Sequence, residues 1–451
     1  MELDVTTTLR PPLAAIVLVS LLALPPLQAR AGDEAPQADA PPPQDPRELN
    51  AFLNYGLSLP AQDPHHHPRI EVIKLPSQGL DEAIWGSTGR DDRGHIWFGV
   101  SRPKVGSAML VEYDPKTRTC QDRGDVISQL RRLAKLRPGE TQVKIHSRII
   151  QAGDGELYFT SMDEEGENPS SLSLPRFGSH LWRHRPGTEG WEHLASAPQA
   201  LISLTGAGRY VYALGYYGHV LHRYDTRTRD WRHVEVGSLG EHVSRNILFD
   251  RLGYVHVPRI KPRPDAPGGV GVELVRYDAS LTERGSLPLD DYFPAKNARE
   301  SHGIISYSYL LDDSLLFATH TGCFYRLYPS QGTHRIEKLG RLLENPANPK
   351  PLYPSSLFAY SGQTHFVTAA ELDTRVNDSR FAWFVIDLPA RSARRWSLRP
   401  PEPSPGAPRM SFATALIYGS QTRDNDGDVY IVGQTHWKDG QALALRIRPA
   451  P

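Results

Sequence analysis

The sequence predicts an all-β protein, a seven-bladed β-propeller built mostly of four-stranded antiparallel blades. Two observations predict this fold. An apolar strand, a tight polar turn and a second apolar strand recur seven times, and a third strand often follows that ends in Tyr-Asp. Helical periodicity is almost absent from these repeats. Strand repeats of this length are typical of a radial array in which each blade packs only on its neighbours.

The second strands of the repeats begin at similar polar turns. These turns lead into strands that start at Gly94, Gly155, Gly208, Gly253, Ser314, Gly362 and Gly427. The spacing assigns the blades to residues 76–122, 143–198, 199–241, 242–292, 300–342, 353–399 and 410–451. Residues 69–75 alternate weakly in hydropathy, so we expect them to supply the outer strand of the last blade and to remove the exposed sheet edges.

Two further local patterns concern a helix and the turns. Residues 125–136 carry apolar side chains near one stripe, which predicts a helix inserted between the first two blades. Several turns between first and second strands are rich in Asp and Gly, as in 91–94 and 424–427. Calcium binding is one interpretation, but no Glu follows at the spacing of a calcium loop. We therefore interpret these segments as hairpin turns.

The N-terminal residues read as an export signal. An apolar run at 13–27 is followed by the cleavage pattern Ala29-Arg30-Ala31, which predicts a signal peptide over 1–31. The run is shorter than a membrane-spanning helix requires. A Pro-rich linker is expected over 32–68 and the propeller over 69–451. These features predict a periplasmic or secreted protein with no membrane attachment after cleavage.

Charge and cysteine content narrow the partners and the chemistry. Fifty-one basic and 51 acidic residues give a formal net charge of zero, which argues against nucleic acid as the partner. The two cysteines, Cys120 and Cys323, fall in the first and fifth predicted blades. Because those blades lie nearly opposite across a ring, a disulfide is out of reach and both thiols are expected to be unpaired.

The fold predicts where functional side chains gather. In a propeller the innermost strand of each blade starts on the face that also carries the loops between second and third strands, and we expect ligands on that face. Three innermost strands begin with His, and three of the loops add another His. The polar candidates on this face are His146, Arg148, Tyr216, Tyr217, His219, His242, Arg245, Arg259, His302, His320, Cys323, Tyr418 and His436. The acidic run 163–165 is interpreted as a solvated loop.

One chemistry that suits these residues is β-elimination on a uronic-acid polymer. Removal of the proton next to a carboxylate needs a cation on the carboxylate, a base with a pKa near neutrality and an acid for the leaving oxygen. Arg245 suits the first task through bidentate geometry, and His146 or His242 suits the second. Tyr217 suits the third, or serves as base and acid together. The residues expected to bind the acidic polysaccharide or oligosaccharide are Arg148, Tyr216, His219, Arg259 and Tyr418.

A second chemistry is a metal site. His320 and Cys323 are three residues apart on one predicted hairpin, and His302 belongs to the same blade. Together they offer three ligands suited to a structural zinc ion. His436 is a fourth ligand only if the ring geometry allows it. The alternative is a free thiol beside a core histidine.

Three segments carry a resemblance to a known family: Lys144-Ile145-His146-Ser147-Arg148, His242-Val243-Ser244-Arg245-Asn246 and Tyr418-Gly419-Ser420-Gln421. They resemble exported bacterial seven-bladed propellers, and over residues 76–451 the chain is similar to propeller polysaccharide lyases, particularly ulvan lyases. The resemblance implies a His/Tyr/Arg catalytic group in a canyon on one face, with a structural metal away from the chemistry. His146, Tyr217 and Arg245 are the matching positions.

The chain departs from that family at one position. The resemblance implies a second His in the loop between the second and third strands of blade two, where this chain has Asp163, Glu164 and Glu165. This departure shifts the role to His242 or His219.

The sequence therefore predicts an exported carbon–oxygen lyase that cleaves a uronic-acid-containing glycan by β-elimination. The alternative is a non-catalytic propeller that binds glycan or protein on the same face. Neither a nucleophile elbow nor a P-loop is present in the sequence.

Overall fold

The structure is a computed structural model in which most of the chain after residue 67 is described. It describes residues 68–77, 79–166, 173–216, 219–239, 242–266, 269–292, 302–343, 352–360, 365–371, 381–396, 411, 414–436 and 439–448. All of them belong to one compact unit, Pro43–Pro451. The predicted signal peptide, and the predicted linker up to residue 67, lie outside the described residues. Within the described part, no helix has the length and apolarity needed to cross a bilayer.

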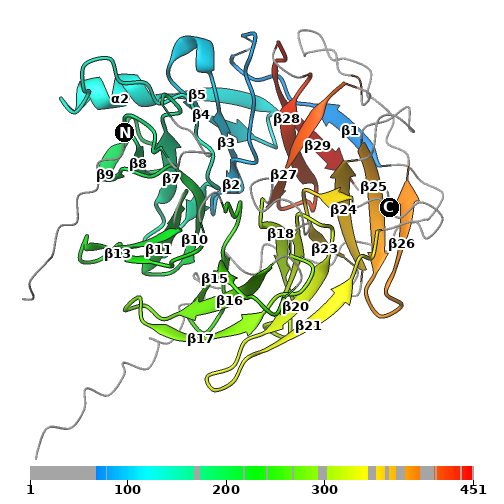
Figure 1. Ribbon diagram of the computed structural model, residues 1–451. Helices are drawn as coiled ribbons and strands as arrows, with labels where there is room; N and C mark the ends of the chain where they lie inside the picture. The colour runs from blue at the N-terminus through cyan, green and yellow to red at the C-terminus, as the bar shows by residue number, and fades with distance from the viewer. Residues whose placement is uncertain are drawn as a thin grey trace, which may run out of the picture. The chain divides into compact units, whose positions relative to one another are not determined.

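The described strands form antiparallel sheets arranged around a common centre (Figure 1). Six of these sheets have four strands each, and one has five. A β-propeller of four-stranded antiparallel blades is thus confirmed, but six blades have this form rather than the predicted seven. In the remaining sheet both β22 (Tyr353–Pro354) and β23 (Phe358–Tyr360) pair with β24 (His365–Glu371). Pro354 has no N–H to donate, and the inner edge of this sheet is divided into two short strands.

In most sheets the strands follow one another in chain order, from the centre outwards. The first three sheets contain β2 (Thr88–Arg90), β3 (Ile96–Val100), β4 (Met109–Asp114) and β5 (Thr119–Asp125); β6 (Ile150–Gln151), β7 (Leu157–Met162), β8 (Ser179–His184) and β9 (Glu192–Ala197); and β10 (Leu201–Ala207), β11 (Tyr210–Gly215), β12 (Val220–Asp225) and β13 (Trp231–Glu235). The next two contain β14 (Leu248–Phe249), β15 (Val255–Pro262), β16 (Val270–Tyr277) and β17 (Glu283–Pro288); and β18 (Ile304–Tyr309), β19 (Leu315–Thr319), β20 (Phe324–Tyr328) and β21 (Arg335–Gly340). The last two contain β22, β23, β24, β25 (Phe381–Asp387) and β26 (Ser392–Trp396); and β27 (Leu416–Arg423), β28 (Val429–Gln434), β29 (Ala442–Arg448) and β1 (Arg69–Val72).

The first and last strands of the described chain close the array. β1 pairs antiparallel with β29, and Arg69 lies opposite Arg448 while Val72 lies opposite Leu445. The prediction that residues 69–75 form an outer strand of the last blade is confirmed, over 69–72. Because β1 pairs with residues 445–448, it covers most of the outer edge of β29 and leaves fewer backbone groups there for another chain to pair with.

A truncation tests the contribution of β1. A chain that begins at residue 76 loses β1 together with Ile73 and Leu75, which are 3% exposed. We expect its thermal midpoint to fall by about 10 °C relative to a chain that begins at residue 68, because buried apolar area and a strand pairing are both lost. Calorimetry of the two truncations measures this. Equal midpoints would show that the closure adds nothing to stability.

The Asp/Gly turns between the first and second strands are hairpin turns with a shared design. The Asp91 carboxylate accepts hydrogen bonds from the His95 N–H (2.9 Å) and from the Trp97 indole N–H (3.1 Å). The Asp424 carboxylate likewise accepts from the Asp428 N–H (2.9 Å) and from the Tyr430 hydroxyl (2.8 Å). Each carboxylate therefore joins the turn to the strand that follows it, which is the local bonding expected of Asp in turns.

The predicted insertion helix is present but shorter than expected. α2 (Val126–Arg132) begins after Asp125, whose side chain accepts the Ser128 N–H at 3.0 Å. The helix ends before Ala134, which has a φ of 54°, a value that no α-helix continues through. A short 3-10 turn, η1 (Pro103–Val105), precedes β4.

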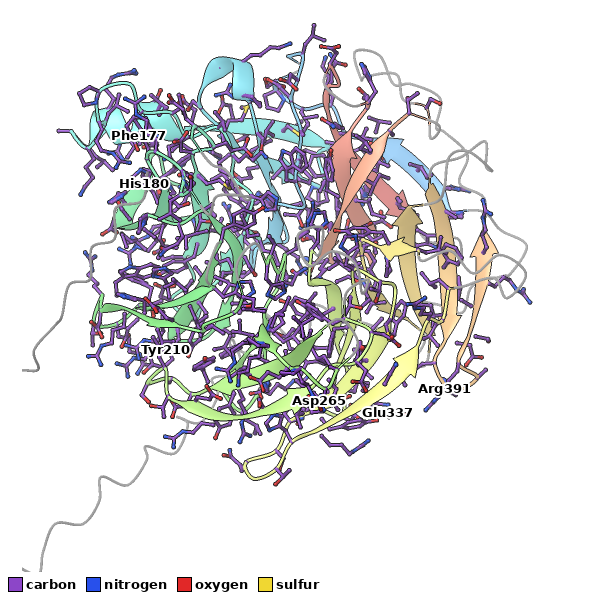
Figure 2. The ribbon with its side chains drawn as sticks, viewed as in Figure 1. Phe177, His180, Tyr210, Asp265, Glu337 and Arg391 are labelled. Atoms are coloured by element: carbon purple, nitrogen blue, oxygen red, sulfur yellow. The ribbon has the colours of Figure 1, made fainter. Side chains whose placement is uncertain are left out.

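Contacts between neighbouring sheets are apolar inside and charged at the rim. One cluster contains Tyr212, Val257 and Phe317, which lie on β11, β15 and β19 of three consecutive sheets. At the rim, Arg391 donates to Glu337 of β21 at 2.6 Å (Figure 2). Burial between sheets supplies the main stabilisation, since exposed ion pairs contribute little.

The two cysteines lie in different sheets. Cys120 is on β5, and Cys323 precedes β20. Both are free, as predicted.

Candidate functional site

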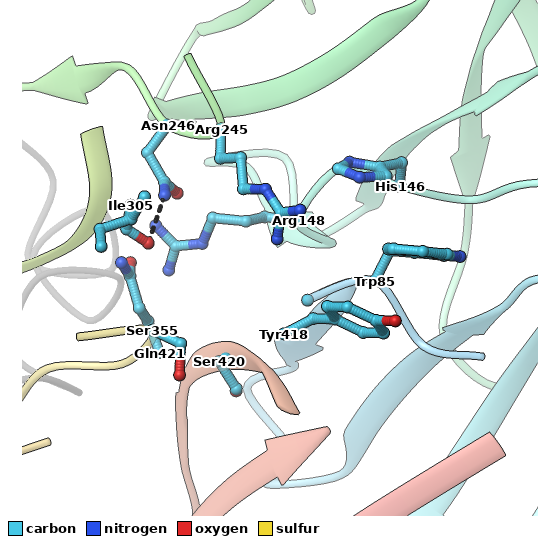
Figure 3. Close-up of a pocket in the computed structure, with 12 residues that line it drawn as sticks. Trp85, His146, Arg148, Arg245, Asn246, Ile305, Ser355, Tyr418, Ser420 and Gln421 are labelled. Atoms are coloured by element: carbon cyan, nitrogen blue, oxygen red, sulfur yellow. Dashed lines mark hydrogen bonds between the residues drawn. The ribbon is translucent and has the colours of Figure 1, made fainter. Parts of the chain in front are cut away.

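A pocket lies where the inner segments of several sheets meet (Figure 3). Its walls are Trp85, Gly86, His146, Arg148, Arg245, Asn246, Ile305, Ser355, Tyr418, Gly419, Ser420 and Gln421. It holds about 390 Å³, including space open to solvent. The structure thus brings together His146, Arg148, Arg245 and Tyr418, four of the residues that the sequence placed on one face.

The backbone that carries these side chains is mostly irregular. His146 and Arg148 precede β6, and Arg245 precedes β14, so they project from the segments that lead into the inner strands. Tyr418 lies on β27 itself. The leading segments of neighbouring sheets are also joined, since the Asn246 N–H donates to the Ile304 carbonyl at 3.0 Å.

Sequence reasoning missed Trp85, which shares a local motif with Tyr418. Trp85-Gly86-Ser87 and Tyr418-Gly419-Ser420 each place an aromatic ring before a glycine of positive φ, 86° at Gly86 and 88° at Gly419. A Cβ on Gly419 would lie 1.7 Å from the Ser355 carbonyl oxygen, so only glycine fits there. The repeated aromatic-Gly-Ser triplet was the signal that could have identified Trp85.

Rings and cations alternate in a series that includes pocket residues and extends beyond the pocket at both ends. The Lys144 ammonium lies 4.2 Å from the centre of the Trp85 ring, and Trp85 stacks on Tyr418 with ring centres 4.1 Å apart. The Arg245 guanidinium carbon lies 5.9 Å from the ring centres of both Tyr418 and Tyr353. Such contacts stabilise a cation without neutralising its charge.

Arg245 has no acidic partner in the described part of the chain. No described carboxylate forms an ion pair with its guanidinium, and two tyrosine rings flank it instead. Arg259, in the same sheet, shows the contrast: its guanidinium donates to Glu273 at 2.6 Å and to Glu283 at 2.9 Å. A partly buried guanidinium without a carboxylate is strongly favoured to bind an anionic ligand.

His146 is a neutral imidazole beside that cation. Burial lowers the pKa of His146 well below its usual range, and the positive charges of Arg245 and Lys144 lower it further. Its Nδ1 lies 3.5 Å from the Ile202 carbonyl oxygen, which makes a proton on Nδ1 the favourable tautomer. The other ring nitrogen, Nε2, then carries the lone pair and can accept a proton. The lowered pKa makes His146 a weaker base than the near-neutral one that the elimination calls for, so its basicity has to rise when an anionic ligand pairs with Arg245.

Arg148 reaches across the centre of the array. Its guanidinium carbon lies 4.8 Å from the centre of the Tyr307 ring, and Nη1 donates to the Tyr307 hydroxyl. Tyr307 is on β18, so this contact links the second and fifth sheets along the chain. In Figure 3 the side chains of Arg148 and Arg245 enter the same part of the pocket.

His242 and His219 do not line this pocket, so their predicted roles as alternative base and substrate ligand lose their geometric basis. His242 is fully buried, and its ring nitrogens lie 2.9 Å from the hydroxyls of Ser238 and Tyr292. His219 is 1% exposed and stacks on His242 with ring centres 4.1 Å apart. Burial lowers the pKa of both, to about 3 for His219. They form a structural pair in the protein interior.

Two other predicted substrate ligands also lie elsewhere. Arg259 does not line the pocket. Its positive charge is already paired with Glu273 and Glu283. Tyr216 packs against an apolar cluster that includes Ile202 and Val243. Tyr217 lies outside the described residues, so its predicted role stays a prediction.

The acidic run 163–165, expected from the sequence to be a solvated loop, is buried at Asp163. Asp163 is fully buried and accepts hydrogen bonds from the Thr141 hydroxyl (2.7 Å) and the Phe177 N–H (3.0 Å). Glu164 pairs with Lys144, and Glu165 pairs with Arg176 at 3.0 Å. Asp163 therefore holds two loops together and does not replace a catalytic histidine.

The three predicted zinc ligands do not converge: among the described residues, the ligand atoms of His302, His320 and Cys323 are not grouped around one point, although the two histidine rings stack. His320 Nδ1 accepts the His302 backbone N–H at 2.9 Å, and His302 Nδ1 lies 3.2 Å from the Tyr353 hydroxyl. Burial raises the pKa of the Cys323 thiol, which opposes the thiolate that zinc requires. His436 is exposed at the other end of the chain. These contacts do not fit a preformed zinc site, and zinc binding stays a prediction.

Among the described residues, one other group has the spacing of metal ligands. Ligand atoms of Asp91, His95 and Glu112 all lie within 4.8 Å of one another. Arg93 donates to both carboxylates, at 2.8 Å to Asp91 and 2.7 Å to Glu112, and Arg123 also binds Glu112. Guanidinium groups therefore already supply the positive charge in this cluster.

Comparison with known proteins identifies no family. No protein-family model matches the chain, and no curated protein matches it. Solved structures with a similar arrangement include the extracellular domain of BT4673 from B. thetaiotaomicron (14% identity, TM-score 0.48), which spans 84% of this chain, whereas this chain spans 40% of that one. YCF48 from Cyanidioschyzon merolae (11%, TM-score 0.48) is aligned over 84% of this chain and 99% of its own. The Cps50 (Swd1) β-propeller domain of Myceliophteria thermophila (10%, TM-score 0.49) is aligned over 85% and 100%.

Proposed function

We propose that this protein is an exported polysaccharide lyase, periplasmic or secreted, that cleaves a uronic-acid-containing glycan by β-elimination in this pocket. The observation that carries the proposal is the state of Arg245. The Arg245 guanidinium lines the pocket and has no carboxylate partner among the described residues. The neutral imidazole of His146 lines the same pocket. A cation and a base side by side are the two groups that removal of a proton next to a carboxylate needs most.

In the proposed reaction Arg245 binds the uronate carboxylate and stabilises the negative charge that develops when the neighbouring C–H bond breaks. His146 Nε2 takes that proton. The electron pair forms the new C=C bond, and the bond from the adjacent carbon to the glycosidic oxygen breaks. A tyrosine protonates the departing oxygen: Tyr217, which the family resemblance indicates, or Tyr418, whose hydroxyl oxygen accepts a hydrogen bond from Gln434 at 2.8 Å.

The proposal includes the five-stranded sheet as a seventh blade. Apolar side chains link it to its neighbours on both sides. Ala359 and Phe384 share a cluster with Ile305 and Leu316 of the preceding sheet. Phe358 and Trp383 share another cluster with Ile417 of the sheet that follows. This arrangement supports a closed ring of seven, in which the five-stranded sheet contributes Ser355 to the pocket.

The test is turnover on a panel of uronic-acid polymers, followed through the ultraviolet absorbance of the unsaturated uronate that each elimination creates. We expect at least one polymer to give product. The competing function, a propeller that binds glycan without cleaving it, predicts binding by calorimetry and no absorbance change with any polymer.

A substitution of His146 tests whether this residue is the catalytic base or has only a structural role. His146→Gln is expected to lower kcat by a factor of about 100 to 10,000, because a glutamine cannot accept the proton. The glycan should still bind, since Arg245 is intact. His436→Gln, at an exposed position outside the pocket, is the matched control and should leave kcat unchanged. Retention of kcat in His146→Gln would exclude this residue as the base.

The pH profile follows from the charge state of His146. Because the pKa of His146 lies well below its usual range, the ring stays unprotonated when pH falls below about 6.5, where an ordinary histidine gains its charge. We expect kcat/KM to stay constant through that pH on the acidic side, for as long as the protein remains folded. An acidic limb centred near pH 6.5 would show that the essential base is a different group.

A further inference from the structure

The contacts around Arg245 form a closed circuit through three other residues. The Arg245 backbone N–H donates to the His302 carbonyl at 3.0 Å. The His302 backbone N–H donates to His320 Nδ1 at 2.9 Å, and His302 Nδ1 lies 3.2 Å from the Tyr353 hydroxyl. The Tyr353 ring then returns to the Arg245 guanidinium at 5.9 Å. Backbone and side chain of Arg245 are thus both tied to the same cluster.

The rings in this circuit are packed in a defined way. His302 and His320 stack nearly parallel, with ring centres 4.8 Å apart and planes 11° from each other. Both present their rings to Tyr353 at nearly right angles, at 5.8 Å and 5.2 Å. His320 must carry its proton on Nε2, because its Nδ1 is a hydrogen-bond acceptor. Two stacked imidazoles, one of them in a defined tautomer, therefore hold the Tyr353 ring.

The circuit contains one positive charge. Burial, followed by the positive charge of Arg245, lowers the pKa of His302 to about 2, so this ring is neutral at ordinary pH. His320 is neutral as well, because its Nδ1 accepts a hydrogen bond and carries no proton. No described carboxylate enters the circuit to pair with Arg245. The cluster therefore orients the guanidinium without cancelling the charge that a ligand carboxylate would meet.

We propose that Tyr353, held by His302 and His320, is a positioning residue that fixes the guanidinium of Arg245 for ligand carboxylates. Tyr353 does not line the pocket, so it acts through Arg245 rather than on the ligand. The inference rests on the proposed function for the role of the ligand carboxylate, whereas the positioning itself is a property of the unliganded protein. Two measurements separate these parts.

The first measurement needs no ligand. The side-chain Nε–H signal of Arg245 in a ¹H–¹⁵N spectrum is assigned as the signal lost in Arg245→Lys. Tyr353→Leu removes the ring, and we expect the Arg245 signal to shift and to show faster motion. Tyr353→Phe keeps the ring and loses the hydroxyl, which contacts His302, so a smaller shift is expected. An Arg245 signal that is unchanged in folded Tyr353→Leu overturns the proposal.

The second measurement is the split between KM and kcat on the polymer that the wild-type protein cleaves. Tyr353→Leu is expected to raise KM about tenfold, equivalent to about 1.4 kcal/mol of binding free energy, with a smaller change in kcat. Tyr328→Leu is the matched control, since Tyr328 packs on Arg326 and Arg335 outside the pocket, and it should change neither quantity. An unchanged KM in Tyr353→Leu overturns the proposal. If the Arg245 signal moves while no polymer is cleaved by the wild-type protein, positioning stands and the lyase function fails.

Discussion

Replacing Arg245 by alanine is expected to lower turnover on a uronate polymer by a factor of about 1,000. The developing charge on the carboxylate would lose the group that stabilises it, and loss of one such donor costs about two to three orders of magnitude in rate. The effect should be large because the Arg245 guanidinium lies between the rings of Tyr353 and Tyr418 and no described carboxylate pairs with it. Initial rates from the absorbance of the unsaturated product measure it.

Two companion variants make this result specific. Arg245→Lys keeps the charge and loses the planar pair of donors, so we expect it to recover only part of the lost rate. Arg284 lies on β17, the outer strand of the sheet whose inner strand follows Arg245, and its exposed guanidinium pairs with Asp278. Arg284→Ala should therefore retain full turnover. Wild-type rates in Arg245→Ala would contradict the proposed mechanism directly.

The second large effect is loss of stability in mild acid. Burial lowers the pKa of His219 and of His222 to about 3. As pH falls below about 6.5, these two histidines bind protons in the unfolded chain before they do so in the folded protein. Their contribution to the free energy of unfolding is therefore constant above that pH and decreases below it. At pH near 5 each of these imidazoles costs about 2 kcal/mol, and the total approaches the whole stability of a modest domain. His242 and His146 shift in the same direction.

Urea unfolding at pH near 7 and near 5 measures this effect. His222 offers a clean variant, because its ring stacks on Trp231 with centres 4.8 Å apart and neither ring nitrogen has a described hydrogen-bond partner. His222→Phe should therefore raise stability, more so in acid, and reduce the pH dependence by one proton. His436→Phe is the matched control, since His436 is exposed and follows β28 of a different sheet. A pH slope that His222→Phe does not alter would refute this source of acid sensitivity.

Much of the fold could be predicted because each repeat carries its own local signals. Alternating apolar strands and Asp/Gly turns are read over a few residues, and the pairing of β1 with β29 was expected from the weak alternation of residues 69–75. The five-stranded sheet could not be predicted in the same way. Its divided inner edge depends on where β24 finds partners, which a local pattern does not contain.

For the site, too, the sequence predicts what depends on spacing along the chain and does not predict contacts between sheets. His146 and Arg148 are two residues apart, so an extended backbone places both on one side, and both line the pocket. His242 and Arg245 are three apart, which places them on opposite sides, and the structure buries His242. Counting residues along the extended segment would have separated these two. The role of Tyr353, by contrast, depends on stacked rings from a neighbouring sheet, which no spacing reveals.

The pairing of residues 69–72 with residues 445–448 has a consequence for how the protein is made. A growing chain emerges from the ribosome with its N-terminal end first, and that strand has to wait for nearly four hundred further residues before its partner exists. The earlier sheets can stack as they appear, but the final seam forms only after residues 445–448 have been made, at the cost of closing a very long loop. Until then the molecule is an open arc, and its two unsealed margins are the places where a chaperone or an unwanted second chain would bind.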